Sequence, residues 1–288
     1  MIRDTNGEPA LFAGMISNLG KRDQIDHMTG LMNRFKFEGD IKKYLVDYEN
    51  VKSLGIMILD MDTFRNINDL YNRSFGDEVL RITGQRIADM LPQEAEIYRL
   101  DGDEFGIIIV NGNAEACGGI YEKIQKKYRK QQEYLGKKYY CTLSAGSVCY
   151  PQNADTYLDL MKFANYSLES SKHAGKNRNT IFSADILEGR ERKLELTELL
   201  RESVERGFAG FSVYYQPQID SQTRALYGAE ALARWKCPKF GTVSPFEFIP
   251  ILEETGMIIP FGGWIFRKAA EQCKIWCQKI PDFHMSRS

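Results

Sequence analysis

The feature that most constrains this chain is an apolar run that ends in acidic residues. Residues Leu54–Leu59 form a short, uninterrupted apolar segment, and Asp60-Met61-Asp62 follows it directly. A continuous apolar run of this length is typical of a strand that is buried on both faces. We therefore expect a central strand whose end presents carboxylates.

A second acidic cluster lies between two further strand-like runs, Ile97–Leu100 and Phe105–Val110. The dipeptide Asp101-Gly102 between them favours a hairpin turn. If the hairpin tip lies beside the end of the first strand, the carboxylates of both segments come together. The residues concerned are Asp60, Asp62, Asp101, Asp103 and Glu104.

Such a group of carboxylates has a chemical consequence. Carboxylates within a few ångströms raise one another's pKa unless a cation lies among them. Mg²⁺ prefers oxygen ligands and usually binds one or two carboxylates together with substrate phosphates. The residues alone therefore predict phosphoryl-transfer chemistry.

Composition is that of an ordinary soluble protein. The chain has 288 residues, enough for two domains, and a formal net charge of −1. It has no global basic field that would favour nucleic acid or an anionic membrane. It also lacks a long apolar segment and a signal-peptide pattern, so we expect no membrane segment. The six cysteines show no CxxC pair or zinc spacing, and we expect a reducing cytoplasm as the location.

The hairpin Asp101-Gly102-Asp103-Glu104-Phe105 resembles the signature of GGDEF domains, the diguanylate cyclases of bacterial cyclic di-GMP signalling. Asp101 stands where the family has its first glycine. A lone GDEF would be weak evidence, but further blocks match in the expected order. They are residues 26–34 (DHMTGLMNR), 60–69 (DMDTFRNIND), 76–77 (GD), 144–146 (SAG) and 172–178 (KHAGKNR).

This resemblance implies an α/β fold of the nucleotidyl-cyclase type, related to the palm of polymerases. Its central sheet is largely antiparallel and flanked by helices. The expected element order is helix, strand, two helices, hairpin, helix, strand, helix, strand. The apolar pattern of residues 79–90 agrees with a helix packed on such a sheet.

The resemblance also implies the chemistry. A diguanylate cyclase condenses two GTP molecules, each 3′-hydroxyl attacking the other's α-phosphate and releasing pyrophosphate, and it acts as a homodimer with Mg²⁺ or Mn²⁺. By carry-over from the family, the metal ligands are Asp60, Asp103 and the Met61 carbonyl. Asp103 and Glu104 are the expected catalytic residues.

The nucleotide contacts follow in the same way. Asn68 and Asp77 match the residues that bind the guanine edge. Asp77 would accept hydrogen bonds from the guanine N1–H and N2 amino group, which adenine lacks. Arg65, Lys172 and Lys176 match phosphate contacts.

The chain is expected to divide into four segments. Residues 1–21 resemble the end of a PAS sensor domain and a linker, 22–183 the GGDEF domain, 184–206 an amphipathic connecting helix, and 207–288 the start of an EAL domain. The EAL family of cyclic di-GMP phosphodiesterases folds as a (β/α)₈-type barrel. Of its metal ligands only Glu230 is present, so we expect no phosphodiesterase activity from this segment. An upstream sensor and a downstream EAL domain are the expected partners in the full-length protein.

Two departures from the family leave the activity open. Asp101 adds a carboxylate near the polyphosphate, and Asn72-Arg73 replaces the usual Gly-His. A working cyclase, a degenerate GTP-binding domain that regulates the EAL domain, and a dimerisation module without nucleotide affinity all remain as hypotheses. Asp62 fits a metal ligand or a loop cap equally well, and Arg99 fits a phosphate contact or a structural ion pair.

Overall fold

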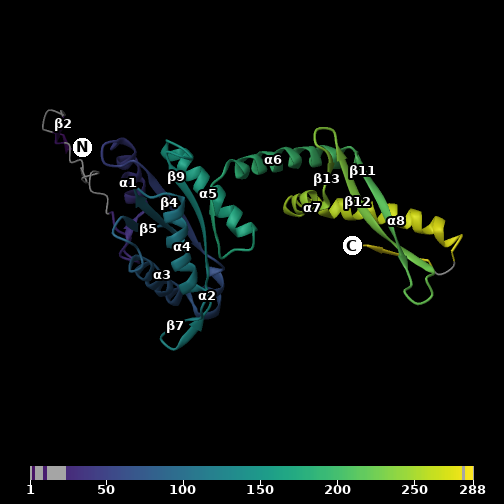
Figure 1. Cartoon of the computed structure of the whole chain (residues 1–288), viewed down its shortest axis with the longest axis horizontal. Helices are drawn as coiled ribbons and strands as arrows, with labels where there is room; N and C mark the ends of the chain where they lie inside the picture. Colours follow the sequence, from purple (N-terminus) through teal and green to yellow (C-terminus); the bar gives the residue numbers. More distant parts are fainter. Residues whose placement is uncertain (1, 4–8, 12–23, 281–282, 288) are drawn as a thin grey trace. The chain divides into compact units, whose positions relative to one another are not determined.

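The computed structural model describes residues 2–3, 9–11, 24–280 and 283–287 (Figure 1). The chain divides into two compact units, residues 1–186 and 187–288. Most of the segment expected to be the end of a sensor domain lies outside the described residues. Within it, strand β1 (Ile2–Arg3) pairs antiparallel with β2 (Pro9–Leu11).

The first unit is built on a six-stranded sheet with the order β10-β9-β4-β6-β5-β3. The central strands are β4 (Leu54–Met61), β5 (Ala95–Asp101), β6 (Glu104–Val110) and β9 (Leu143–Tyr150). Neighbours among these four run antiparallel. The edge strands β3 (Met32–Asn33) and β10 (Asn179–Ile181) run parallel to their neighbours. The largely antiparallel sheet is confirmed.

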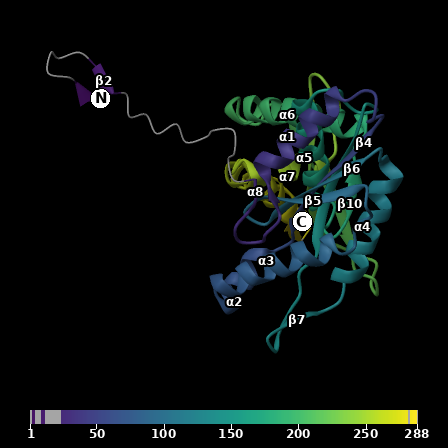
Figure 2. The same ribbon diagram turned by 90° about the vertical axis from the view of Figure 1, so that its left-hand side faces the viewer.

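Helices cover both faces of this sheet (Figures 1 and 2). They are α1 (Arg34–Val46), α2 (Phe64–Tyr71), α3 (Arg73–Ala88), α4 (Ala114–Tyr128) and α5 (Tyr157–His173). The expected element order is found, with two additions. The short strand β3 precedes α1, and a small hairpin of β7 (Gln132–Tyr134) and β8 (Lys137–Tyr139) precedes β9.

Strand β4 is buried along its whole length because both faces of the sheet are covered. Met57, Leu59 and Met61 belong to one core cluster, with residues of α3 and α4. Ile56 and Ile58 belong to the other, with residues of α1 and α5. Since side chains alternate along a strand, Asp60 continues the row that faces α1 and α5.

Helix α5 lies directly on β9 because Gly146 leaves room for it. A Cβ at this position would lie 2.2 Å from the Ala164 carbonyl oxygen and from the Leu168 backbone nitrogen. The Ser171 hydroxyl also donates to the Ala145 carbonyl at 2.7 Å. This close packing places the last turn of α5 beside the end of β4.

The second unit has a smaller sheet in which β12 (Leu226–Cys237) is central. Its other elements are β11 (Phe211–Ile219), β13 (Gly241–Val243), α7 (Pro245–Glu254), α8 (Ile258–Cys277) and β14 (His284–Arg287). β14 runs parallel to β12, and α7 and α8 connect them, as in the βαβ units of a barrel. The described strands do not close a barrel.

Helix α6 (Ala184–Glu205) occupies the segment where a connecting helix is expected. Its second half contributes Leu196 and Leu200 to the core of the second unit. The core of this unit is aromatic: Phe211 stacks on Trp235 with a centroid separation of 5.6 Å. Among the described residues, no helix is both long and apolar enough to cross a membrane.

Candidate functional site

The end of β4 and the tip of the β5–β6 hairpin lie side by side, as expected. Asp60 is opposite Glu104 of β6 on one side and opposite Ser144 of β9 on the other. The Met61 N–H donates to the Asp103 carbonyl at 3.2 Å. Because the N–H and C=O of a strand residue point to the same edge, the Met61 carbonyl also faces the hairpin.

The turn of this hairpin lies one residue later than the Asp-Gly dipeptide predicted. Asp101 pairs with Glu104, so Gly102 and Asp103 form the two-residue turn. Gly102 has a φ of +49°. The Asp101 carboxylate accepts a hydrogen bond from the Gly102 N–H at 2.8 Å, and its side chain is exposed. The shift places Asp103, and not Asp101, at the tip beside β4.

Arg99 explains the shift and proves to be structural. Its side chain is 4% exposed. Its guanidinium donates to the carbonyls of Gly102 and, at 2.7 Å, Glu104. A third hydrogen bond, to the Asp101 carbonyl, measures 3.3 Å. The irregularity between Arg99 and Asp101 coincides with this contact. Arg99 therefore supports the hairpin from inside, and it does so through backbone carbonyls and not through the expected ion pair.

Asp62 is also structural, although it lies only two residues after Asp60. Its carboxylate accepts from the Ser144 hydroxyl at 2.6 Å, the Thr142 hydroxyl at 2.7 Å and the Asn177 N–H at 3.1 Å. The residue is 4% exposed. Its oxygens accept from β9, from Thr142 just before β9 and from the loop after α5, so it ties this loop to the sheet. The sequence pointed to Ser144 as part of a motif, but gave no signal for Thr142.

Asp60 has different surroundings. It is 9% exposed, and its Oδ2 lies 2.6 Å from the Lys172 ammonium of α5. Burial raises the pKa of Asp60, Lys172 opposes this, and the nearby Asp103 raises it further. Burial and the charge of Asp60 likewise raise the pKa of Glu104. Burial is the largest cause of both shifts, and the three carboxylates of Asp60, Asp103 and Glu104 add to it by interacting with one another.

The donor set fits a hard divalent cation. Among the described residues, no three acidic, histidine or cysteine side chains are arranged so that they alone would hold a metal. Mg²⁺ does not require such a cage, since it takes one or two carboxylates and completes its shell with water and phosphate. Asp60, Asp103 and the Met61 carbonyl supply oxygens of this kind, and a bound cation would offset the mutual repulsion of the carboxylates.

The residues expected to bind guanine lie on two neighbouring helices. Asn68 is on α2 and Asp77 is on α3, where its side chain is exposed. The Asn68 Oδ1 is buried and has no hydrogen-bond partner among the described residues. A Cβ on Gly76 would lie 1.9 Å from this oxygen, so glycine makes room for the amide. A buried acceptor without a donor is costly for folding, so it calls for a partner such as a water, an ion or a ligand.

The expected phosphate contacts are only partly assembled. Lys172 is at the carboxylates, as described above. Arg65 is exposed on α2, and its nearest acid is Asp69 at 3.8 Å. Lys176 is exposed in the turn after α5, where its φ is +63°. Both cations are thus on elements that also carry site residues, but they do not contact the carboxylates.

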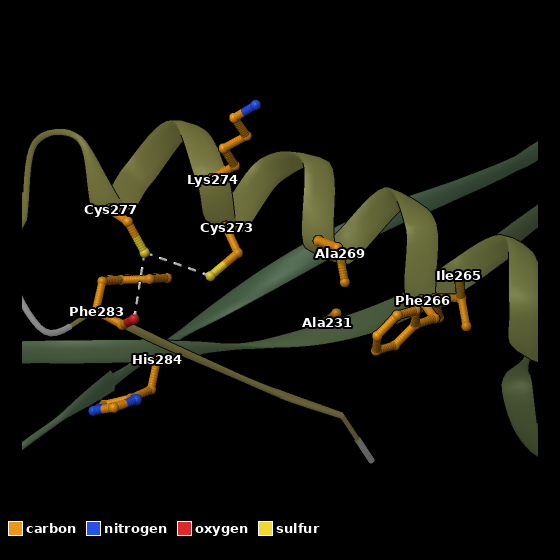
Figure 3. A pocket seen from close by; sticks show the side chains of 10 residues that line it. Ala231, Ile265, Phe266, Ala269, Cys273, Lys274, Cys277, Phe283 and His284 are labelled. Atoms are coloured by element: carbon orange, nitrogen blue, oxygen red, sulfur yellow. Dashed lines mark hydrogen bonds between the residues drawn. The ribbon is translucent and has the colours of Figure 1, made fainter.

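A separate hollow of about 450 Å³ lies in the second unit, between α8, β12 and the start of β14 (Figure 3). Its lining is mainly apolar and includes no carboxylate. Cys273 and Cys277 approach to 3.7 Å between sulfurs at its rim. Glu230, the acid that the resemblance assigns in this segment, lies in β12 opposite Gln216. The hollow does not share the chemistry of the carboxylate site.

Comparison with known families gives two matches. The family model of the diguanylate cyclase GGDEF domain matches residues 23–178, and that of the EAL domain matches residues 198–287. The first match covers the carboxylates, the residues expected to contact guanine, and the lysines of α5 and its following turn.

Curated relatives are longer proteins. The chain is 27% identical over 252 residues to the bifunctional diguanylate cyclase/cyclic di-GMP phosphodiesterase MucR of Pseudomonas aeruginosa, covering 87% of this chain and 36% of MucR. It is 28% identical over 271 residues to the cyclic di-GMP phosphodiesterase NbdA of the same organism, covering 94% of this chain and 34% of NbdA. The chain thus spans about a third of these relatives' length.

A solved structure supports the fold of the first unit. A truncated form of TpbB (or YfiN) from Pseudomonas aeruginosa, comprising only its GGDEF domain, superposes with a TM-score of 0.54 at 26% identity. The match covers 57% of this chain and 97% of the other.

Proposed function

The chain belongs to the diguanylate cyclase GGDEF domain family and continues into part of an EAL domain, and on this premise we propose that its first unit condenses two GTP molecules into cyclic di-GMP. The observation that carries the proposal is the group of carboxylates of Asp60, Asp103 and Glu104, with Lys172 as its cation.

In this proposal Asp60, Asp103 and the Met61 carbonyl hold Mg²⁺ or Mn²⁺. When bound, the ion neutralises triphosphate charge and lowers the pKa of the attacking 3′-hydroxyl. Glu104, whose pKa is raised by burial and by Asp60, is suited to accept a proton near that hydroxyl. Asp103 lies at the hairpin turn and would hold the ion from that side.

Lys172 has two partners in the proposed cycle. Lys172 pairs with Asp60 at 2.6 Å. If Asp60 held a divalent cation, Lys172 would be available to contact the phosphates. Its side chain is 36% exposed, so it is accessible to a ligand.

Side chains of α2 and α3 would select guanine over adenine. The Asn68 Oδ1 offers an acceptor to a guanine donor, and Asp77 offers a carboxylate to the N1–H and N2 amino pair. Arg65 and Lys176 would bind phosphate from the two sides of the carboxylate group. One protomer presents one GTP, so turnover requires two such units facing each other.

A second candidate function is favoured by Asp101 and by Asn72-Arg73. The Asn72 side chain caps α3 by accepting from the Phe75 N–H at 2.9 Å, so this replacement preserves the helix start. Both departures retain the fold but alter the surroundings of the nucleotide. In this alternative the unit binds GTP without turnover and regulates a cytoplasmic EAL phosphodiesterase in the full-length protein.

The test is incubation of the purified chain with GTP and Mg²⁺, with cyclic di-GMP and pyrophosphate followed by chromatography. Formation of both products, abolished in Asp103→Asn, supports the cyclase. Saturable GTP binding without product, together with product formation by Asp101→Gly, supports the regulatory alternative. Absence of both binding and product contradicts both functions.

A further inference from the structure

Basic side chains gather at the C-terminal end of α4 and in the β7–β8 hairpin. Residues 122–138 carry seven basic and two acidic residues, a net charge of +5, whereas the whole chain has −1. The basic patch consists of Lys123, Lys126, Lys127, Arg129, Lys130, Lys137 and Lys138. All seven side chains are exposed.

The charges of the basic patch are not balanced locally. None of its members forms an ion pair within 4.0 Å with an acid in the part of the chain that the structure describes. Lys126 and Lys127 lie in the last turn of α4, where the helix dipole favours cations. Lys123 and Lys130 are not in this last turn. Together with Lys126 and Lys127 they line a hollow of about 360 Å³.

The tip of the hairpin adds an apolar residue that folding does not explain. Tyr134 pairs with Lys137, which leaves Leu135 and Gly136 as a two-residue turn with φ values of +48° and +74°. Such turns favour Asn, Asp or Gly at the first position, and a leucine with positive φ is strained. Leu135 is also 80% exposed, so it gains no burial in return.

The hairpin is nevertheless held firmly. The Tyr71 hydroxyl donates to the Lys138 carbonyl at 2.7 Å, and the Tyr134 hydroxyl lies 3.3 Å from the Glu78 carboxylate. Lys137 lies over the rings of Tyr71 and Phe75 at 5.3 and 5.2 Å. The tip of the β7–β8 hairpin projects beyond α2 and α3 in both views of the molecule (Figures 1 and 2).

We propose that this surface docks on an anionic lipid membrane. Leu135 enters the boundary between headgroups and acyl chains, and the lysines of the basic patch contact the lipid phosphates. Six of the seven cations are lysine and the tip residue is aliphatic. A surface that binds nucleic acid would favour arginine and aromatic side chains on which bases stack. The net charge of −1 conceals this patch, because acids elsewhere in the chain offset it.

Sedimentation of the purified chain with lipid vesicles tests the proposal. We expect binding to vesicles of equal parts phosphatidylcholine and phosphatidylglycerol, weakened by salt, and none to phosphatidylcholine alone. Each lysine near an anionic surface contributes about a fivefold gain in partitioning. The triple variant Lys126→Gln, Lys127→Gln, Lys130→Gln should therefore bind roughly a hundredfold more weakly.

Two controls separate the surface from overall charge and from folding. The triple variant Lys43→Gln, Lys52→Gln, Lys162→Gln changes net charge equally at exposed lysines outside the patch and should bind as the unaltered chain does. Leu135→Asn suits the turn, so it should keep or raise the unfolding midpoint while binding about tenfold more weakly.

Several outcomes would overturn the proposal. They are equal loss of binding in both lysine triples, unchanged vesicle binding by Leu135→Asn, and no preference for the anionic vesicles. Tighter binding to a single-stranded oligonucleotide than to vesicles, with no dependence on Leu135, would identify nucleic acid as the partner instead.

Discussion

Asp60 and Asp62 stand two residues apart in sequence, yet their surroundings differ in kind. The Asp62 carboxylate accepts three hydrogen bonds, from two hydroxyls and a backbone N–H. Asp60 has one lysine and lies among other acids, and burial with these acids raises its pKa. A carboxylate held by several donors of the fold ties its elements together, whereas one that lies among acids with a single cation is suited to bind a ligand.

The largest expected effect is on activity. Asp60→Asn removes a proposed metal ligand and should lower GTP turnover by roughly 10³-fold, a loss typical of removing one charge-stabilising group. Its unfolding midpoint should fall little or rise, because the substitution also removes a buried charge among acids. Chromatography of the product and thermal unfolding measure the two quantities. A stable variant with full turnover would remove Asp60 from the site.

Asp62→Asn should show the opposite pattern. An amide cannot accept all the hydrogen bonds of the carboxylate and leaves buried donors unpaired, which costs about 3 kcal/mol. The unfolding midpoint should fall by about 6–12 °C. Below that temperature the folded fraction should keep its turnover within a few-fold. If Asp62→Asn lost turnover without losing stability, the distinction between the two aspartates would fail.

Gly76→Ala tests the buried, unpaired Asn68 Oδ1, which is proposed to contact the nucleotide base. The new Cβ displaces the Asn68 amide, so GTP should bind about tenfold more weakly, or about 1.4 kcal/mol. Calorimetric titration with Mg²⁺-GTP measures this. Gly119→Ala is the matched control, since it is also a helical glycine but has open space around its Cβ. Adding Asn68→Ala to Gly76→Ala should cause no further loss, because both act on one contact.

The smallest effect is expected for Glu104→Gln in the absence of ligand. Since folding raises the pKa of Glu104, ionisation of this group destabilises the folded state. The variant should therefore be more stable than the unaltered chain at neutral pH, seen as a higher unfolding midpoint. The difference should shrink as pH falls and vanish below the ordinary value of 4.5, where the carboxyl becomes protonated in both states. A difference that persists well below this pH would contradict the assignment of charge.

Much of this fold follows from local pattern. The continuous apolar run of β4 predicts a strand buried on both faces, and the acids after it lie at the sheet end as expected. The hairpin at 101–104 is found, but its turn is displaced by one residue. The Asp-Gly dipeptide is a local preference, and the buried Arg99, with its bonds to three carbonyls, overrides it.

The remainder depends on tertiary contacts that spacing does not reveal. The β7–β8 hairpin was missed because its strands are short and polar and its turn is Leu-Gly, which is not a usual hairpin dipeptide. The separate roles of Asp60 and Asp62 were also undetermined, because they depend on Lys172, Thr142 and Asn177, all distant in sequence.

The most direct test of the central contrast is calorimetric titration of Mg²⁺-GTP into the unaltered chain, Asp60→Asn and Asp62→Asn below their unfolding temperatures. We expect similar affinity for the unaltered chain and Asp62→Asn, and loss of the Mg²⁺-dependent part of binding in Asp60→Asn. Equal Mg²⁺-dependent affinity in all three, or a loss confined to Asp62→Asn, would contradict it.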